Sequence, residues 1–252
     1  MHVLRTTLDT LQQAIANAQQ SAALGAVSID VVNNGEASAE LSNEVQARTL
    51  HLLEGHGNVG YGRGHNLSIL PSQADFHLIL NPDASLAADA LSAGLRFLHA
   101  QPDVIAVSPR VSNVDGSQQF ACKRYPSVLD FLLRGFAPAC VRARFDTRLA
   151  RYEMRELSED HASTDIPIIS GCCMLFRTCA LQAVQGFDPR YFLYFEDFDL
   201  SLRAHSQGTL AYLPSMRIQH VGGNSARKGL RHIGLFVRSG IRFYNTHGWR
   251  FL

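Results

Sequence analysis

The sequence predicts an α/β fold, a sheet with helices on both faces, from three observations. Short β-branched or apolar runs alternate with amphipathic stretches through the first half of the 252-residue chain. Such alternation is typical of mostly parallel sheets that are covered by helices. Hydrophobic residues make up 46% of the chain and charged residues 18%, which excludes a disordered polyelectrolyte. No apolar run reaches the roughly 20 residues that a membrane-spanning helix needs.

The first half gives the expected elements in order. Helices are expected over 6–20, 41–53 and 85–100. Residues 27–35 predict a strand followed by a turn, residues 76–83 a strand that runs into a loop, and residues 103–109 another strand. Residues 111–120 are typical of a hairpin around Asp115 and Gly116. Because ligands of such folds bind beyond the carboxyl ends of the strands, the residues that follow the strand at 76–80 form a candidate site.

The second half is less regular. Helical pieces are expected at 127–134 and 147–157, a buried strand region at 166–176, and a helix over 196–208 that Gly208 ends. The sequences TLAYLP and MRIQHV predict two short strands. Residues 229–246 predict a helix with an apolar stripe.

The C-terminal segment is basic, whereas the rest of the chain is acidic. Residues 200–252 contain eight Arg and Lys and no acid, and residues 1–199 contain 15 basic and 22 acidic residues. Arg231, Arg238 and Arg242 lie outside the apolar stripe of the last helix. Two interpretations remain open: contact with an anionic membrane surface, and packing on the body with the arginines in solvent.

The five cysteines and the N-terminus bear on the cellular compartment. No CxxC motif is present, and adjacent Cys172 and Cys173 sit in an apolar run, so neither disulfides nor zinc ligands are expected. The first residues lack the pattern of a signal peptide. We expect a reducing, cytoplasmic environment and no nucleic-acid partner.

Asn81, Pro82 and Asp83 close the apolar strand at 76–80. An aspartate in this position can hold a hard divalent cation such as Mg²⁺ against a pyrophosphate. The sequence Asn-Pro-Asp is also typical of turns, and taken alone the motif favours a turn.

Three further motifs have one structural and one functional interpretation each. The glycine-rich run GNVGYGRGHN (57–66) suits a flexible loop or close approach to an anionic ligand. The motif FEDFDL contains three acids, Glu196, Asp197 and Asp199. They would either stabilise the start of a helix or provide a general base. His220 suits a structural role or a ligand to a cation held by Asp83.

The apolar motifs SGCCMLF (170–176) and GFDPRYF (186–192) are expected to be mostly core. Ser170 and Gly171 have little side-chain volume and would allow an acceptor sugar to approach closely. Tyr191, Phe192 and Tyr194 are candidates for stacking on that sugar; Phe192 is expected in the core, and both interpretations remain open for the two tyrosines.

Taken in order, the motifs NVGYGRGHN, LILNPD, KRYPS, SGCCMLFR, GFDPRYFLYFEDFDLSLR and LAYLPSMRIQHVGG resemble the family 2 glycosyltransferases. Within that family the chain is most similar to bacterial rhamnosyltransferases of lipopolysaccharide and O-antigen synthesis. The resemblance covers about residues 24–250. It implies a GT-A fold, with a nucleotide-sugar half at 1–109, an acceptor half at 110–226 and a basic amphipathic helix at 227–252.

The resemblance also implies roles for individual residues. Asp83 and His220 match the metal-binding residues of the family, and Asp197 matches the catalytic base, with Glu196 beside it. The residues expected at the nucleotide-sugar donor are Asn34, Gly60, Gly64, Asn66, Asn81 and Asp83. The family often has an acid where this chain has Asn34.

The implied reaction is an inverting transfer that depends on Mg²⁺ or Mn²⁺. The cation neutralises the diphosphate leaving group, and Asp197 takes the proton of the attacking hydroxyl. The expected donor is dTDP-rhamnose, and the expected acceptor is a cell-surface glycan or a lipid-linked sugar. The protein is then expected in the cytoplasm, with peripheral contact at the inner face of the cytoplasmic membrane.

One departure from the family pattern concerns the first central strand. Family members begin with a strand that lies between those at 27–32 and 76–80, whereas this sequence starts at the helix that follows it. A start placed too late is the favoured explanation; a shortened chain and an inactive member are the others. The alternative function is therefore that of a non-catalytic partner in a polysaccharide assembly complex, and a nucleotidyltransferase is a weaker candidate.

Overall fold

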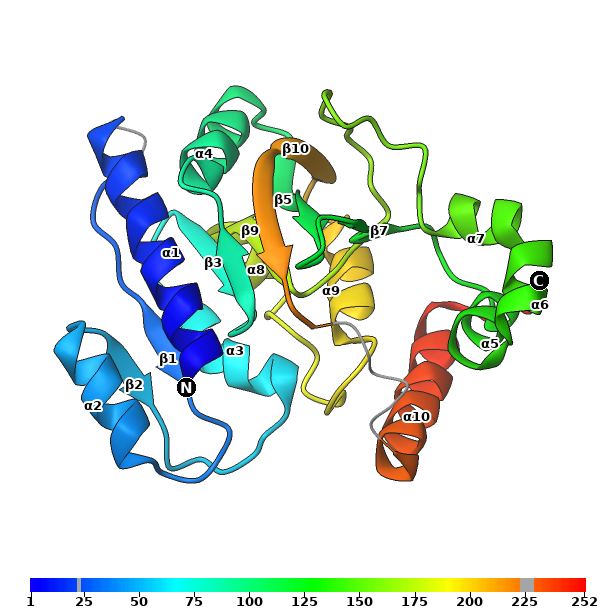
Figure 1. Cartoon of the computed structure of the whole chain (residues 1–252), viewed down its shortest axis with the longest axis horizontal. Helices are drawn as coiled ribbons and strands as arrows, with labels where there is room; N and C mark the ends of the chain where they lie inside the picture. The colour runs from blue at the N-terminus through cyan, green and yellow to red at the C-terminus, as the bar shows by residue number, and fades with distance from the viewer. Residues whose placement is uncertain (22–23, 223–228) are drawn as a thin grey trace.

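The computed structural model describes residues 1–21, 24–222 and 229–252. Its centre is a twisted sheet whose strands follow the spatial order β3, β9, β5, β10 and β4 (Figure 1). The strands span Phe76–Leu80 (β3), Cys173–Arg177 (β9), Val104–Ser112 (β5), Thr209–His220 (β10) and Ala84–Leu86 (β4).

The central sheet is mixed, so the prediction of a mostly parallel sheet is wrong. β10 runs parallel to β5, but β9 is antiparallel to both β3 and β5, and β4 is antiparallel to β10. The apolar run that forms β9 is buried on both faces, and burial alone does not encode strand direction. β3, β5 and β10 thus share one direction, and β9 lies between β3 and β5 and runs in the opposite direction.

The strand β10 replaces the two short strands that the sequence predicts. Its pairing with β5 shifts register between Leu213 and Arg217, so one irregular strand continues past Pro214. The hairpin at 111–120 is confirmed: β6 (Gln118–Gln119) pairs with β5, and Gly116 has a φ of 83°.

Helices cover both faces of the sheet, as the alternation predicts. The helices α1 (His2–Gln20) and α4 (Ala90–Ala100) pack on one face, in a core that includes Leu95 and Leu175. A second core on the other face takes residues from α3 (Tyr61–Ile69), α8 (Thr178–Ala183) and α9 (Glu196–Ala204).

A separate two-stranded sheet lies at one edge of the molecule (Figure 1). Its parallel strands are β1 (Asp30–Val32) and β2 (His51–Leu53), with α2 (Ala39–Ala47) between them in sequence. The helix predicted over 41–53 is therefore too long, because its last residues form β2. Among the described residues, β1 pairs with β2 alone and β3 with β9 alone, so the central strand of the family pattern is missing here.

Four helices gather at the opposite end of the molecule (Figure 1): α5 (Val128–Phe136), α6 (Ala139–Arg144), α7 (Asp146–Tyr152) and α10 (Leu230–His247). The short strands β7 (Cys122–Lys123) and β8 (Ile168–Ile169) pair antiparallel. α10 closes a small core around Tyr191, Phe195 and Phe243. The predicted boundary at 226/227 lies outside the described residues, and the division into halves remains a prediction.

All five cysteines are free thiols. Within 1–21, 24–222 and 229–252, no helix combines the length and the apolar character that a bilayer crossing needs.

Candidate functional site

The candidate site lies at the edge of the sheet where β3 and β10 end and β9 begins. Asp83 follows β3 and precedes β4, and His220 is the last residue of β10. The antiparallel pairing of β4 with β10 sets His220 opposite Ala84, which brings His220 beside Asp83. The backbone N–H of Asn81 donates to the Cys172 carbonyl at 2.9 Å and ties the loop after β3 to the start of β9.

Three side chains converge on one point at this edge. His220 Nε2 lies 3.1 Å from Asp83 Oδ1 and 3.1 Å from Asn81 Nδ2. The side-chain oxygen of Asn81 is buried and has no hydrogen-bond partner in the described structure. Carboxylate oxygen, amide oxygen and imidazole nitrogen are the donors that Mg²⁺ and Mn²⁺ accept, so these residues fit the predicted cation.

Gln119 orients the His220 ring. Its amide nitrogen donates to the His220 carbonyl at 2.8 Å and to Asn113 Oδ1 at 2.5 Å, which turns its oxygen toward His220 Nδ1 at 3.1 Å. This network assigns the ring proton to Nδ1. In that tautomer Nε2 is the nitrogen without a proton, and it faces both Asn81 Nδ2 and Asp83 Oδ1 at 3.1 Å.

Among the described residues, no three His, Cys, Asp or Glu side chains gather into a closed metal cage. Asp83 and His220 would therefore supply only part of a coordination shell. Mg²⁺ in proteins is commonly held by one or two side chains together with substrate phosphates, so an incomplete protein shell is compatible with the prediction.

Asp197 lies across from this cluster at the start of α9. Its Oδ2 accepts from the Gly171 N–H at 2.9 Å, and its Oδ1 accepts from the Phe198 N–H at 3.0 Å. Tyr194 and Phe195 both adopt left-handed backbone conformations, with φ values of 72° and 66°. This sharp turn directs the first residues of α9 toward the sheet edge; non-glycine residues in this region commonly mark functional sites.

Burial raises the pKa of both adjacent acids. Burial and the charge of Asp197 raise the pKa of Glu196 to about 8, and Glu196 Oε2 is buried without a hydrogen-bond partner. Burial also raises the pKa of Asp197, but two backbone N–H groups and the charge of Lys123 act to lower it. Glu196 therefore keeps its proton at neutral pH, and Asp197 is the better candidate for a base.

The third acid of the cluster has a structural role. Asp199 is fully buried, accepts from Arg203 Nε at 2.7 Å and from His247 Nε2 at 2.8 Å, and so links α9 to the end of α10.

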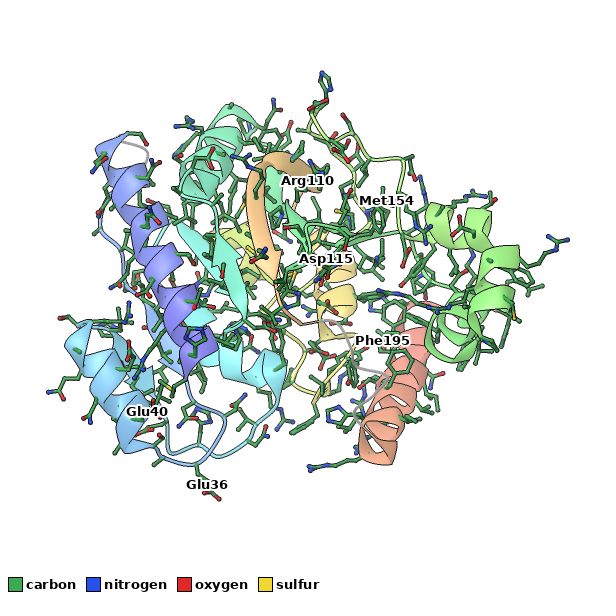
Figure 2. All side chains as sticks on the ribbon, in the orientation of Figure 1. Glu36, Glu40, Arg110, Asp115, Met154 and Phe195 are labelled. Atoms are coloured by element: carbon green, nitrogen blue, oxygen red, sulfur yellow. The ribbon has the colours of Figure 1, made fainter. Side chains whose placement is uncertain are left out.

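A cavity of about 600 Å³ unites most of the predicted site residues. Its lining includes Asn81, Ser170, Gly171, Tyr194, Glu196, Asp197 and His220. Its far wall is aromatic, with Phe131 from α5 and Phe236 from α10, and Phe195 lies beside α10 (Figure 2). A second cavity of about 480 Å³ is lined by Asp83, the start of α1 and, like the first, Tyr61 and Asn81.

The remaining predicted donor residues lie in or beside the glycine-rich loop. Asn34 Nδ2 donates to the Gly60 carbonyl at 3.0 Å, and Gly64 packs against Asn34. Asn66 uses its amide on Phe187, donating to its carbonyl at 2.7 Å and accepting from its N–H at 2.9 Å. These contacts organise the loop, and direct contact of the four residues with a donor remains a prediction.

Sequence reasoning missed Tyr61, Gln119 and Lys123. The Tyr61 hydroxyl donates to the Gly171 carbonyl at 2.6 Å, so the Gly171 peptide connects Tyr61 with Asp197. Lys123 is 4% exposed and donates to the Phe120 carbonyl. Tyr61 and Lys123 stand inside the motifs YGRGHN and KRYPS, so a chemical interpretation of those motifs could have identified them.

The family can now be assigned. A family model described as glycosyltransferase like family 2 matches residues 2–233. The chain belongs to this family. The expected enzyme class, a glycosyltransferase, is thereby confirmed, together with the resemblance to rhamnosyltransferases that follows.

Two curated relatives of this family 2 chain are named as rhamnosyltransferases. The N-acetylglucosaminyl-diphospho-decaprenol L-rhamnosyltransferase of Mycobacterium tuberculosis (strain H37Rv) is 28% identical over 239 residues, which cover 88% of this chain and 76% of the relative. Rhamnosyltransferase WbbL of Escherichia coli K12 is 23% identical over 205 residues, covering 78% and 71%.

Solved structures confirm the GT-A type of fold for this family 2 chain. GalNAc-T7, crystallised with UDP, GalNAc and Mn²⁺, has a TM-score of 0.64 at 10% identity. The mannosyltransferase PcManGT of Pyrobaculum calidifontis, in complex with GDP-Man and Mn²⁺, has a TM-score of 0.59 at 17% identity. Each likeness covers 95% of this chain but only 45% and 60% of those chains, so this chain spans less than two thirds of their length.

Proposed function

We propose that the protein is an inverting, metal-dependent rhamnosyltransferase that moves rhamnose from dTDP-rhamnose to a lipid-linked glycan acceptor. The observation that carries the proposal is the single cavity at the sheet edge. It brings Asn81 and His220, at the cation end, together with Asp197, at the base end. The rhamnosyltransferase names of two relatives support the donor sugar.

Asp83, Asn81 and His220 would hold the divalent cation. When bound, Mg²⁺ or Mn²⁺ supplies positive charge that stabilises the nucleoside diphosphate as it leaves. Gln119 keeps the His220 ring in the tautomer whose unprotonated Nε2 faces Asn81 and Asp83. Both solved GT-A structures were obtained with Mn²⁺, which supports this choice of ion.

Asp197 acts as the general base. The acceptor hydroxyl oxygen forms a bond to the anomeric carbon of the donor, while the bond from that carbon to the diphosphate oxygen breaks. The hydroxyl proton passes to Asp197, whose carboxylate is held in place by the Gly171 and Phe198 N–H groups. Attack on the face opposite the leaving group inverts the anomeric configuration.

The cavity supports an acceptor with both polar and apolar parts. Ser170, Gly171 and Tyr194 line it near Asp197, where an acceptor sugar would bind, and Phe131 and Phe236 form the apolar wall. The mycobacterial relative is named for a diphospho-decaprenol acceptor, which joins a sugar to a lipid. We infer that this protein works at the inner face of the cytoplasmic membrane.

The substitution Asp197→Asn tests the proposal. It keeps the size of the side chain but removes the base, so transfer should fall by about 10²–10⁴-fold. Binding of dTDP and Mn²⁺, measured by calorimetry, should survive. Asp115→Asn, in the exposed hairpin turn, is the matched control. Unchanged transfer by Asp197→Asn would disprove the base assignment, and absence of dTDP binding by the unaltered chain would favour the non-catalytic alternative.

A further inference from the structure

Exposed apolar side chains are concentrated at one end of the described molecule. Nine of the sixteen large exposed apolar side chains in the described residues belong to α5, α6 with its following residue, α10 and the C-terminal residues. These elements lie together on the side of the molecule away from α1 and α2 (Figure 1). Such a concentration is typical of a surface that meets a partner.

The helix α10 has a second apolar stripe beside the face that it buries. Phe243 and Tyr244 pack into the core with Phe195. Ile233, Val237 and Ile241 are 37%, 49% and 48% exposed. Their spacing of four residues places them on one side of the helix, so they form a continuous stripe along it.

A row of arginines accompanies this stripe. Arg231, Arg238 and Arg242 recur at helical spacing along α10, next to the apolar stripe. Arg231 and Arg238 are exposed, whereas Arg242 is half-buried with its guanidinium over the Tyr191 ring. The segment 229–252 contains no acidic residue. α6 also combines arginines with an exposed apolar side chain. None of its residues is buried, and exposed Val141 is close in sequence to Arg142 and Arg144.

The charge and shape of this surface select one partner. A protein partner of this chain would need a complementary acidic and apolar groove, whereas a bilayer with anionic lipids offers phosphates above acyl chains along its whole surface. α10 provides the matching arrangement, with arginines beside an apolar stripe. Ile233 both lines the 600 Å³ cavity and belongs to the exposed stripe, so the stripe leads to the cavity.

We propose that α10 lies in the headgroup region of an anionic bilayer. Ile233, Val237 and Ile241 insert among the acyl chains, and the arginine row binds lipid phosphates. The cavity then opens at the bilayer surface, where a lipid-linked acceptor can enter without leaving the membrane. The last step rests on the proposed function, whereas the membrane contact itself does not.

Vesicle flotation of the full chain tests the contact. The unaltered protein should float with vesicles of phosphatidylglycerol and phosphatidylcholine, and less with phosphatidylcholine alone. The double variant Val237→Ser/Ile241→Ser should lower the partition coefficient by at least about tenfold, as expected for losing two inserted side chains. The control Leu67→Ser/Leu70→Ser changes two equally exposed apolar residues on and beside α3 and should partition normally.

Two further measurements separate charge and folding from insertion. Arg231→Gln/Arg238→Gln, at the two fully exposed arginines of the row, should reduce flotation with anionic vesicles and have little effect with neutral ones. Trp249 is the single tryptophan of the chain, is 47% exposed and follows α10, so its emission should shift to shorter wavelength on vesicle binding. All variants should bind dTDP and Mn²⁺ in the absence of vesicles.

Flotation of the Val237→Ser/Ile241→Ser variant equal to that of the unaltered chain would overturn the proposal. So would absence of flotation by the unaltered chain, or a dimer in light scattering that the same variant dissociates while vesicles bind neither form. Failure of the proposed function would look different: vesicle binding would remain, but dTDP would not bind.

Discussion

The side-chain oxygen of Gln119 lies 3.1 Å from His220 Nδ1, while its amide nitrogen is held by the His220 carbonyl at 2.8 Å. One side chain thus fixes both the backbone and the ring of His220. Hydrogen bonds of this kind to a metal-binding histidine set its tautomer and its basicity.

Gln119→Leu should weaken Mn²⁺ binding by about 10–100-fold, because the His220 ring loses the group that orients it. Calorimetric titration with Mn²⁺ alone measures the effect without any transfer assay. Gln118→Leu, on the same short strand, is the control and should bind Mn²⁺ normally. Equal affinity of both variants would show that Gln119 has no orienting role.

Glu196→Gln should change how stability depends on pH. Folded Glu196 keeps its proton up to about pH 8, whereas an ordinary glutamate releases it near 4.5. Between these values the folded state binds more protons, so stability decreases as pH rises, with each pKa unit equivalent to about 1.4 kcal/mol. The glutamine variant lacks this decrease. Urea unfolding at pH 5 and pH 8 measures the difference, and a parallel loss in Glu196→Gln and the unaltered chain would contradict the shift.

Lys123→Met should move the acidic limb of the kcat/KM profile to higher pH. Burial lowers the pKa of Lys123 to about 7, so its charge is present in acid, where it lowers the pKa of Asp197. Loss of that charge should shift the limb by less than about one pH unit, since the effect of Lys123 is smaller than those of burial and the backbone N–H groups. Arg217→Met, an exposed cation paired with Asp89, is the control and should leave the limb in place.

Gly60→Ala should destabilise the fold more than Gly55→Ala. Both glycines have a φ near 90°, so either alanine costs about 1–2 kcal/mol of backbone strain. A Cβ at Gly60 would also collide with the Phe192 carbonyl oxygen, whereas nothing lies within 4 Å of a Cβ at Gly55. The collision should add about 1–3 kcal/mol in urea unfolding. Equal losses would mean that the loop at Phe192 moves freely.

The sequence predicted the elements around the candidate site, but not the direction of every strand in the sheet. Asn81 and His220 follow strands whose ends meet at one edge of the sheet, so the order of the motifs could place them together. Asp197 begins α9 and was assigned by the family resemblance; it lines the same cavity as Asn81 and His220, whereas Asp83 lines the neighbouring one. The predicted strand direction was wrong at β9, since an apolar run is compatible with either direction. The predicted division into two strands was wrong at β10, which is continuous. The role of Gln119 depends on a residue 101 positions away, and no local pattern encodes that contact.

The pairing of β4 with β10 determines when the candidate site forms during folding and when it is lost during unfolding. Asp83 and His220 come together only when β4 and β10, from distant parts of the chain, have paired. Asp197 reaches the Gly171 N–H only when α9 has packed against the sheet. The ability to bind a cation should therefore appear late in folding and be lost early in denaturation. Mn²⁺ affinity is then a sensitive measure of whether the native topology is intact.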